Sequence, residues 1–347
     1  MKFTLLPKLS PLAKRRIANF RANKRAFFSL IALLVIFLLS LCSEIIANDK
    51  PILLFHKGGV YFPIVVSYPE TTFGGEFATE ADYRDPFVAS LLNKNGWAIW
   101  PPVRFSHETI NKGLNRPFPA PPSLENPLGT DDSGRDVLAQ VIYGIRLSLL
   151  FGLLLTIVSP VIGILVGAIM GYFGGFIDIF FQRVLEIYES IPQLFLLIII
   201  TSIIAPGFWL LFFILAIFEW TSFVGLVRAE FLRARNFDYV RAAGALGVGH
   251  IKIMFRHILP NALTSTLTFI PFILSGSVLT LAILDLLGFG LPPSEPSLGR
   301  ILAQGQHNLQ APWLSLTGFF AIAILLSLMV FIGEGLRDAF DTKKTFR

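Results

Sequence analysis

Charged residues and cysteine are scarce in this sequence of 347 residues. Asp, Glu, Lys and Arg together make up 15%, against about 25% in soluble domains, whereas hydrophobic residues make up 54%. This composition excludes an ordinary soluble globular protein. Cys42 has no partner for an intrachain disulfide, and no cluster of Cys and His indicates a metal site. We therefore expect a membrane protein that binds no metal.

The sequence also lacks the motifs of nucleotide binding and catalysis. It has no G-x-x-x-x-G-K-[ST] phosphate-binding loop, and the glycines of GALGVG (244–249) are not ordered as in a dinucleotide fingerprint. The net charge of +6 does not indicate nucleic-acid binding, because basic residues in membrane proteins mostly set orientation. We expect no enzymatic activity and no cofactor in this chain, so ATP and Mg²⁺ would be bound by a partner.

Apolar runs of roughly 20 residues, the length that crosses a bilayer, are frequent. They predict an all-α membrane protein with six spans, at residues 26–46, 147–177, 180–204, 208–227, 261–287 and 312–332. The acidic segment LGTDDSGRD (128–136) lacks the Asp spacing of a calcium loop. It predicts instead a turn into a helix capped by Asp132 or Ser133.

Basic residues predict the orientation of these spans. Residues 1–25 hold eight Lys and Arg, residues 228–260 hold six and residues 333–347 hold four, whereas residues 288–311 hold one. Because cytoplasmic loops are the basic ones, both termini and loop 228–260 are expected in the cytoplasm. The chain then divides into a basic N-terminus (1–25), the first span (26–46), an outer insertion (47–140), a five-helix core (141–335) and a tail (336–347).

The outer insertion is rich in proline and aromatic residues and contains no spanning run. We expect it to be irregular. Its segment VYFPIVVSYP (60–69) has β-favouring residues, but the prolines suit an edge strand or an extended loop.

The cytoplasmic loop contains the segment YVRAAGALGVGHIKIMFRHILPNAL (239–263). Alanines at 241–246 favour a helix, and Gly247 and Gly249 can end it because glycine adopts the left-handed conformation. Residues 251–258 predict a second short helix, and Pro260 can begin the fifth span. A helix–turn–helix with small side chains lets another protein approach closely; the alternative is an ordinary connector with a basic face.

Several charged side chains fall within the predicted spans. Glu219 lies nine residues before Arg228, about 13 Å into the membrane at ~1.5 Å per residue. Such a charge is costly and faces a bundle interior or a water-filled cavity. It either lines a translocation path or hydrogen-bonds at a helix interface.

Two further groups of charges have two interpretations each. Arg183, Glu186 and Glu189 are spaced by three residues and share one helix face, as a structural network or a substrate gate. Asp285, near the outer end of the fifth span, either meets solvent or substrate or caps a neighbouring helix.

The cytoplasmic segment resembles the EAA loop of ABC-transporter permease subunits. AAGALG is followed by nine residues and HILP, and Arg241 stands where the family has a leading glutamate, which the peptide-permease branch often lacks. Further fragments are similar, in order, to the C-type subunits of dipeptide/oligopeptide permeases: NPLGTDDSGRDVLAQVIYGIRLSL, GYFGGFID, ESIPQLFLL, FDYVRAAGALG, RHILPN, LGFGLPPSEPSLG and APWLSLTGFF. The similarity is close over residues 126–347 and loose over 1–46, and the enlarged insertion resembles the Yej-type branch.

The resemblance implies a type I ABC importer permease in the bacterial inner membrane, with a periplasmic insertion, that carries oligopeptides or peptide-like compounds inward. It implies a second homologous permease, two ATP-binding subunits and a periplasmic peptide-binding protein as partners, in contact with membrane lipid. The residues it assigns to ATPase coupling are Tyr239, Arg241, Ala242, Ala243, Ala245, Leu246, Gly247, His257 and Pro260. Glu219, Asp285 and Glu186 are candidates for the peptide path. The alternative, a self-sufficient channel or secondary transporter, is disfavoured by the docking loop and by the lack of a conspicuous internal repeat.

Overall fold

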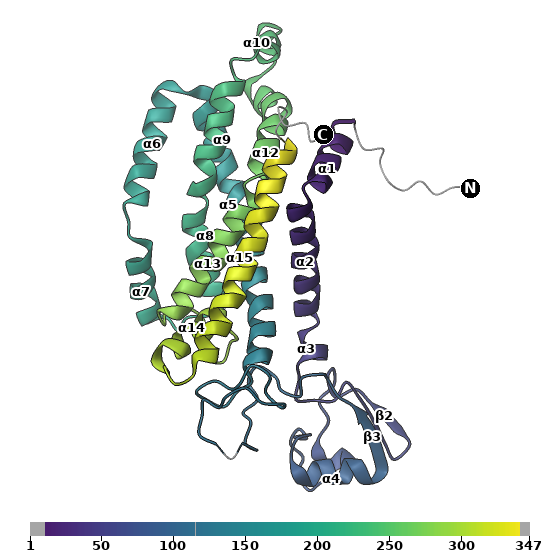
Figure 1. The fold of residues 1–347 in the computed structure, drawn as a ribbon. Helices are drawn as coiled ribbons and strands as arrows, with labels where there is room; N and C mark the ends of the chain where they lie inside the picture. The colour runs from purple at the N-terminus through teal and green to yellow at the C-terminus, as the bar shows by residue number, and fades with distance from the viewer. Residues whose placement is uncertain (1–10, 115, 341–347) are drawn as a thin grey trace, which may run out of the picture. The chain divides into compact units, whose positions relative to one another are not determined.

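The computed structural model describes residues 11–114 and 116–340, which are largely helical (Figure 1). They form two compact units. Unit 1 comprises residues 11–34, 150–280 and 324–340, and unit 2 comprises residues 35–149 and 281–323.

The elements that lie wholly or partly in unit 1 are helical. They are α1 (Pro11–Ala22), α2 (Lys24–Leu41), α5 (Val137–Phe173), α6 (Gly175–Glu189), α7 (Gln193–Ile203), α8 (Phe208–Glu219), α9 (Thr221–Ala234), α10 (Asp238–Ala245), α11 (His250–Lys252), the π-helical turn η2 (Ile253–Ile258), α12 (Leu259–Leu267), α13 (Ile270–Leu286) and α15 (Pro312–Phe340). Unit 2 adds α3 (Ser43–Ile46), β1 (Leu53–His56), β2 (Gly59–Tyr61), the 3₁₀ turn η1 (Glu70–Phe73), α4 (Pro86–Asn95), β3 (Gly96–Ile99) and α14 (Leu298–His307).

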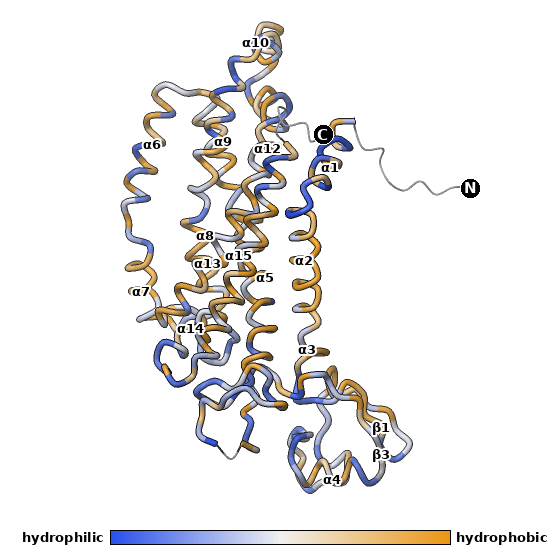
Figure 2. Tube along the Cα trace, in the orientation of Figure 1, coloured by the Kyte–Doolittle hydropathy of each residue, from blue (hydrophilic) through white to orange (hydrophobic). Residues whose placement is uncertain are grey.

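Four helical stretches are long and apolar enough to cross a membrane: α2, α5, the stretch α8–α9 (Phe208–Ala234) and α15; Figure 2 colours the chain by hydropathy. The pair α6–α7 adds a fifth if it is counted as one span, although its two helices are bent by 56°. Helix α13 is apolar but has only 17 residues. The described residues therefore contain four or five candidate spans, fewer than the six predicted.

Two predicted spans are interrupted near prolines. The predicted span 180–204 is broken between α6 and α7, where Pro192 precedes α7 and has no N–H to continue the helical ladder. The predicted span 261–287 is divided between α12 and α13, and Pro271 lies in the first turn of α13, where a helix tolerates proline. Apolar runs do not reveal such breaks, because the residues on both sides are equally hydrophobic.

Helix α5 begins at Val137, well before the predicted start at residue 147. Its first turns are too polar for a membrane run, yet they are helical. The predicted cap was wrong, because the Asp136 carboxylate, and not Asp132 or Ser133, accepts the hydrogen bond from Ala139 N (2.7 Å). Asp136 directly precedes the first helical residue, which is the position that a capping side chain requires.

Three glycines of α5 pack directly against the backbone of α9. Gly163, Gly167 and Gly171 recur every four residues and so share one helix face. A Cβ atom at these positions would lie 2.4 Å from Trp220 O, 2.7 Å from Val224 O and 2.5 Å from Arg228 O, respectively. Only glycine permits this separation of the two helices, the arrangement that small-xxx-small motifs produce in membrane proteins.

The insertion is not wholly irregular, which corrects the sequence-based expectation. In unit 2, β1 pairs antiparallel with both β2 and β3, in the order β2-β1-β3. One face of this sheet packs on η1 and α4 through Leu54, Phe73, Tyr83, Val88 and Leu92. The segment with β-favouring residues does supply an edge strand, β2, which ends before Pro63. The long-range pairing of β1 with β3 has no local signal that sequence reading could use.

Candidate functional site

Helix α10 occupies the first half of the predicted cytoplasmic loop and ends at the predicted glycine. Val248 N donates to Ala243 O (3.1 Å) and Gly247 N donates to Gly244 O (3.0 Å), which closes the last turn. Gly247 has a φ of 78°, in the left-handed region. The prediction that Gly247 ends this helix is confirmed.

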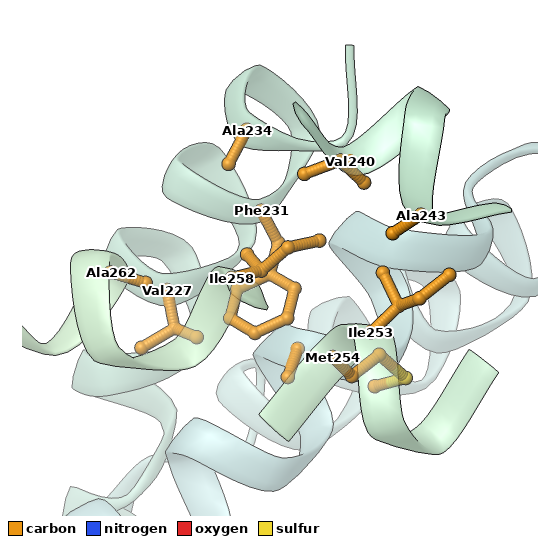
Figure 3. Packing of buried hydrophobic residues seen from close by; sticks show 10 residues of the cluster. Val227, Phe231, Ala234, Val240, Ala243, Ile253, Met254, Ile258 and Ala262 are labelled. Carbon is orange, nitrogen blue, oxygen red and sulfur yellow. The ribbon is translucent and has the colours of Figure 1, made fainter. Parts of the chain in front are cut away.

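The inner face of α10 is anchored in a hydrophobic cluster that we call the loop core. Figure 3 shows Val240 and Ala243 of α10 beside Phe231 of α9 and Ile253 and Met254 of η2. All five side chains are buried, and Phe231 is completely inaccessible to solvent. The loop is therefore a packed substructure whose position depends on α9 and η2, and not a flexible connector.

Three large apolar side chains of the same loop are exposed. Leu246 is 84% exposed, Ile251 is 74% exposed and Phe255 is 49% exposed. We call these three side chains the loop tip. In Figure 1, α10 stands beyond the ends of α9 and α12. These three large apolar side chains of the loop are therefore left largely uncovered by the described residues.

Some of the predicted coupling residues are buried in the loop and others are exposed on it. Ala243 is buried and His257 is half-buried, whereas Tyr239, Arg241, Ala242, Ala245, Leu246, Gly247 and Pro260 are exposed. Sequence reasoning missed Val240 as an anchor and Ile251 and Phe255 as part of the exposed face. The four-residue spacing of Ile251 and Phe255, which puts them on one helix face, was the available signal.

Pro260 lies inside a helical stretch and does not begin one, contrary to the prediction. The stretch continues from His250 to Leu267, and the π-helical turn η2 directly precedes α12. In an α-helix the ring of Pro260 would clash with the carbonyl of Arg256, four residues earlier. The wider π-helical turn at that point accommodates the proline without ending the helix.

The end of α5 is bound to the chain on both sides of α10. The hydroxyl of Tyr172 lies 2.8 Å from Nδ1 of His250, the first residue of α11. The guanidinium of Arg235, three residues before α10, donates to Tyr172 O (3.4 Å). Phe173 also contacts the His250 ring, at 6.1 Å between centroids. The end of α5 is therefore in contact with the segments directly before and after α10.

A bidentate ion pair joins α6 to α9. Arg228 Nε donates to Asp178 Oδ1 (2.6 Å) and Arg228 Nη2 donates to Asp178 Oδ2 (2.7 Å). Both side chains are mostly buried. The two parallel hydrogen bonds fix orientation as well as distance, so the start of α6 is held against the helix that leads into the loop.

The three candidate path residues have different surroundings. Glu219 ends α8 and is half-buried, and within residues 11–114 and 116–340 no hydrogen bond or ion pair reaches its carboxylate. Glu186 is exposed and forms an ion pair with Arg183, its neighbour three residues earlier. This contact is the structural i,i+3 pair that the sequence offered as one of two roles.

Asp285, in unit 2, is only 7% exposed and both of its oxygens are engaged. Oδ1 accepts from Leu291 N (2.7 Å) and Oδ2 accepts from the Ser297 hydroxyl (2.6 Å). The Ser297 hydroxyl in turn accepts from Arg300 N and caps α14. Asp285 thus supports the cap of α14 through Ser297 and does not cap the helix itself. This is an indirect version of the capping role that was one of the two predictions for Asp285.

No group of three His, Cys, Asp or Glu side chains in the described parts of the chain is arranged to hold a metal ion. The described loop combines a buried anchor with exposed apolar side chains, and no catalytic constellation was expected.

Comparison with known proteins gives a consistent result. Residues 163–345 match the family described as "Binding-protein-dependent transport system inner membrane component". The chain is 55% identical over 339 residues to the inner membrane ABC transporter permease protein YejE of Escherichia coli, which covers 98% of this chain and 99% of the relative.

Two further relatives have more specific names. The peptidoglycan transport system permease protein YejE of Agrobacterium fabrum is 53% identical, with 98% of this chain and 96% of the relative covered. The dipeptide transport system permease protein DppC of Escherichia coli is 41% identical over 223 residues, covering 64% of this chain and 74% of the relative.

Proposed function

Because the chain belongs to the family of binding-protein-dependent transport system inner membrane components, we propose that it forms one half of the membrane channel of an ABC importer for oligopeptides or peptide-like compounds. The second half is a homologous permease, the energy comes from two ATP-binding subunits, and a periplasmic binding protein delivers the substrate. The name of the DppC relative, a dipeptide permease, supports a peptide substrate. A self-sufficient channel or secondary transporter is not favoured, because the relatives are ABC permeases.

The proposed topology has six spans with both termini in the cytoplasm. The four or five candidate spans support it. We add the pair α12–α13 as the sixth, because the 17 apolar residues of α13 approach the length of a span and α12 extends them. The excess of basic residues in loop 228–260 and in the tail supports a cytoplasmic side for both.

The observation that carries the coupling role is the loop tip, whose Leu246 is 84% exposed on a helix that is anchored by buried Val240 and Ala243. Such a rigid projection suits docking into a groove of an ATP-binding subunit. When that subunit moves, Tyr172 receives the motion through His250 and Arg235, and α5 moves with α10. The contacts at 2.8 and 3.4 Å support this route.

For the peptide path we retain Glu219 as the leading residue. Its half-buried carboxylate, unpaired within the described residues, can meet a peptide ammonium group or a water-filled cavity. Glu186, which is exposed and paired, and Asp285, which is buried and fully hydrogen-bonded, are weaker candidates.

The test of coupling compares Leu246→Asp with Leu309→Asp. Leu309, in unit 2, is 85% exposed and so matches Leu246 in exposure, but it lies outside the loop. Burying a leucine contributes about 1.5–3 kcal/mol, so a buried aspartate at 246 should weaken docking at least tenfold. The full transporter with its partners would be purified, and retained ATP-binding subunits and peptide-stimulated ATP hydrolysis would be measured.

We expect Leu246→Asp to lose both signals and Leu309→Asp to keep them. Equal behaviour of the two variants would refute docking through the loop tip. Uptake of labelled tripeptides into vesicles that contain the wild-type complex tests the substrate class separately, and absence of ATP-dependent uptake would refute it.

A further inference from the structure

The three-stranded sheet of unit 2 is apolar on both faces. The strand register places Phe55 opposite Val60 on one side and opposite Trp97 on the other, and places Leu53 opposite Ile99. These five residues share one face, because side chains alternate along a strand. The opposite face, with Leu54, Tyr61 and Ala98, packs into the core of the insertion.

The face formed by Leu53, Phe55, Val60, Trp97 and Ile99, which we call the outer sheet face, is open to solvent. Val60 is 56% exposed, Trp97 is 53% exposed and Ile99 is 48% exposed. The rings of Trp97 and Phe55 stack at 6.1 Å with an interplanar angle of 17°. An antiparallel sheet with one free face normally carries polar residues there. An apolar surface in their place indicates that another phase or molecule covers it.

The sheet is held close to the end of a membrane helix. Strand β1 begins at Leu53, after a linker of residues 47–52 that follows α3. Asn48 N donates to Val103 O and Val103 N donates to Ile46 O, both at 3.0 Å, and the Tyr143 hydroxyl donates to Ala47 O at 2.9 Å. The short linker spans at most about 20 Å when fully extended. The sheet therefore begins within about 20 Å of the end of α3, the short helix that follows α2.

Two lysines lie at one end of the sheet. His56 pairs with Gly59 and with Gly96, so Lys57 in the β1–β2 turn and Lys94 just before β3 are at the same end. Both are exposed, and neither forms an ion pair with any residue in the described parts of the chain. The three strands themselves contain no Asp, Glu, Lys or Arg. Lys57 Nζ lies 3.7 Å from the place of a Cβ at Gly74, which ends η1, and Lys94 belongs to α4, so both lysines lie toward the packed face. The outer sheet face is therefore uncharged, and an apolar face with a tryptophan matches the composition of proteins at a lipid interface.

We propose that the outer sheet face lies on the lipid surface beside α3. Trp97, Val60 and Ile99 enter the boundary between headgroups and acyl chains. The insertion is thereby supported by the bilayer as well as by the chain. The proposal rests on the proposed function only in taking α2 as a membrane span.

Quenching of a fluorescent label by doxyl-labelled lipid tests the proposal in the full-length chain. In a Cys42→Ser background, single cysteines replace Val60, Ile99 or, as a control, Ser90, which is exposed on α4. Each variant is labelled with an environment-sensitive fluorophore and reconstituted into bilayers with doxyl-labelled lipid. We expect labels at 60 and 99 to be quenched severalfold more than the label at 90, and to resist iodide in the aqueous phase.

Two results would overturn the proposal. Quenching by iodide at 60 and 99, as at 90, would show a solvent-exposed face. Protection from both quenchers would show that a protein covers it. None of these readouts depends on peptide uptake, so failure of the proposed substrate leaves them interpretable.

Discussion

Replacing Gly171 by alanine should separate α5 from α9, whereas the same change at Gly225 should not. A Cβ at Gly171 would lie 2.5 Å from Arg228 O and 2.6 Å from Phe231 Cβ, both rigid atoms, while ordinary contact begins at 3.4 Å. The helices must therefore move apart by close to an ångström. A Cβ at Gly225, on an exposed side of α9, meets nothing within 4 Å.

The difference between the two variants isolates the contact. Overpacking of this kind costs about 1–3 kcal/mol. Alanine is preferred over glycine in a helix by up to ~1 kcal/mol, and this gain is present in both variants and cancels in the comparison. We therefore expect Gly171→Ala to be less stable than Gly225→Ala by about 1–3 kcal/mol.

Thermal unfolding of the purified transporter in mild detergent measures that difference, and hydrogen exchange shows where it acts. Because Phe231 belongs to the loop core, amide exchange in α10 should rise in Gly171→Ala and stay at the wild-type level in Gly225→Ala. Equal stability and equal exchange in the two variants would show that the helices are not in backbone contact at this glycine.

Three further predictions concern the loop, the α6–α9 ion pair and the insertion. Gly247→Ala should destabilise the loop by about 1–2 kcal/mol, because Gly247 has a left-handed φ. Gly249→Ala should be close to neutral, because the φ of Gly249 is −60°. Similar rates of amide hydrogen exchange in α10 in the two variants would contradict this prediction. Asp178→Asn should cost roughly 1–3 kcal/mol by weakening two charge-assisted hydrogen bonds, as measured by thermal unfolding, and an unchanged midpoint would count against the pair. Burial, and next the nearby Lys57, lower the pKa of His56, so the folded insertion prefers the neutral ring; its stability should be complete above the unfolded pKa of about 6.5 and fall as the pH drops toward the lower folded value. His56→Leu should flatten this dependence in exchange measurements of β1 between pH 5 and pH 8, and an unchanged slope would exclude His56 as its source.

Several features of the fold could be predicted from the sequence because their physical causes are local. Scarce charge and long apolar runs determined the membrane class, since transfer into a bilayer depends on composition within one segment. The end of α10 at Gly247 was predictable because the left-handed conformation that closes a helix suits glycine. The cytoplasmic position of the loop remains a prediction from the distribution of basic residues.

Other features depend on partners far away in the chain, and only the tertiary structure decided them. The glycine spacing of α5 is visible in the sequence, but the helix it contacts is not, because α9 lies some fifty residues later. The outer sheet face exists only because β1 pairs with β3 across α4.

The chemical role of a charged residue likewise requires its neighbours. Asp285 and Glu219 looked alike as acidic residues in apolar runs, yet Asp285 is satisfied by Leu291 and Ser297, whereas no described residue pairs with Glu219. By itself the sequence determined which residues carry charge, flexibility or hydrophobicity, because these are properties of single side chains and short segments. Only the tertiary structure decided which of those charges are neutralised and which surfaces remain uncovered, because both depend on the packing of distant segments.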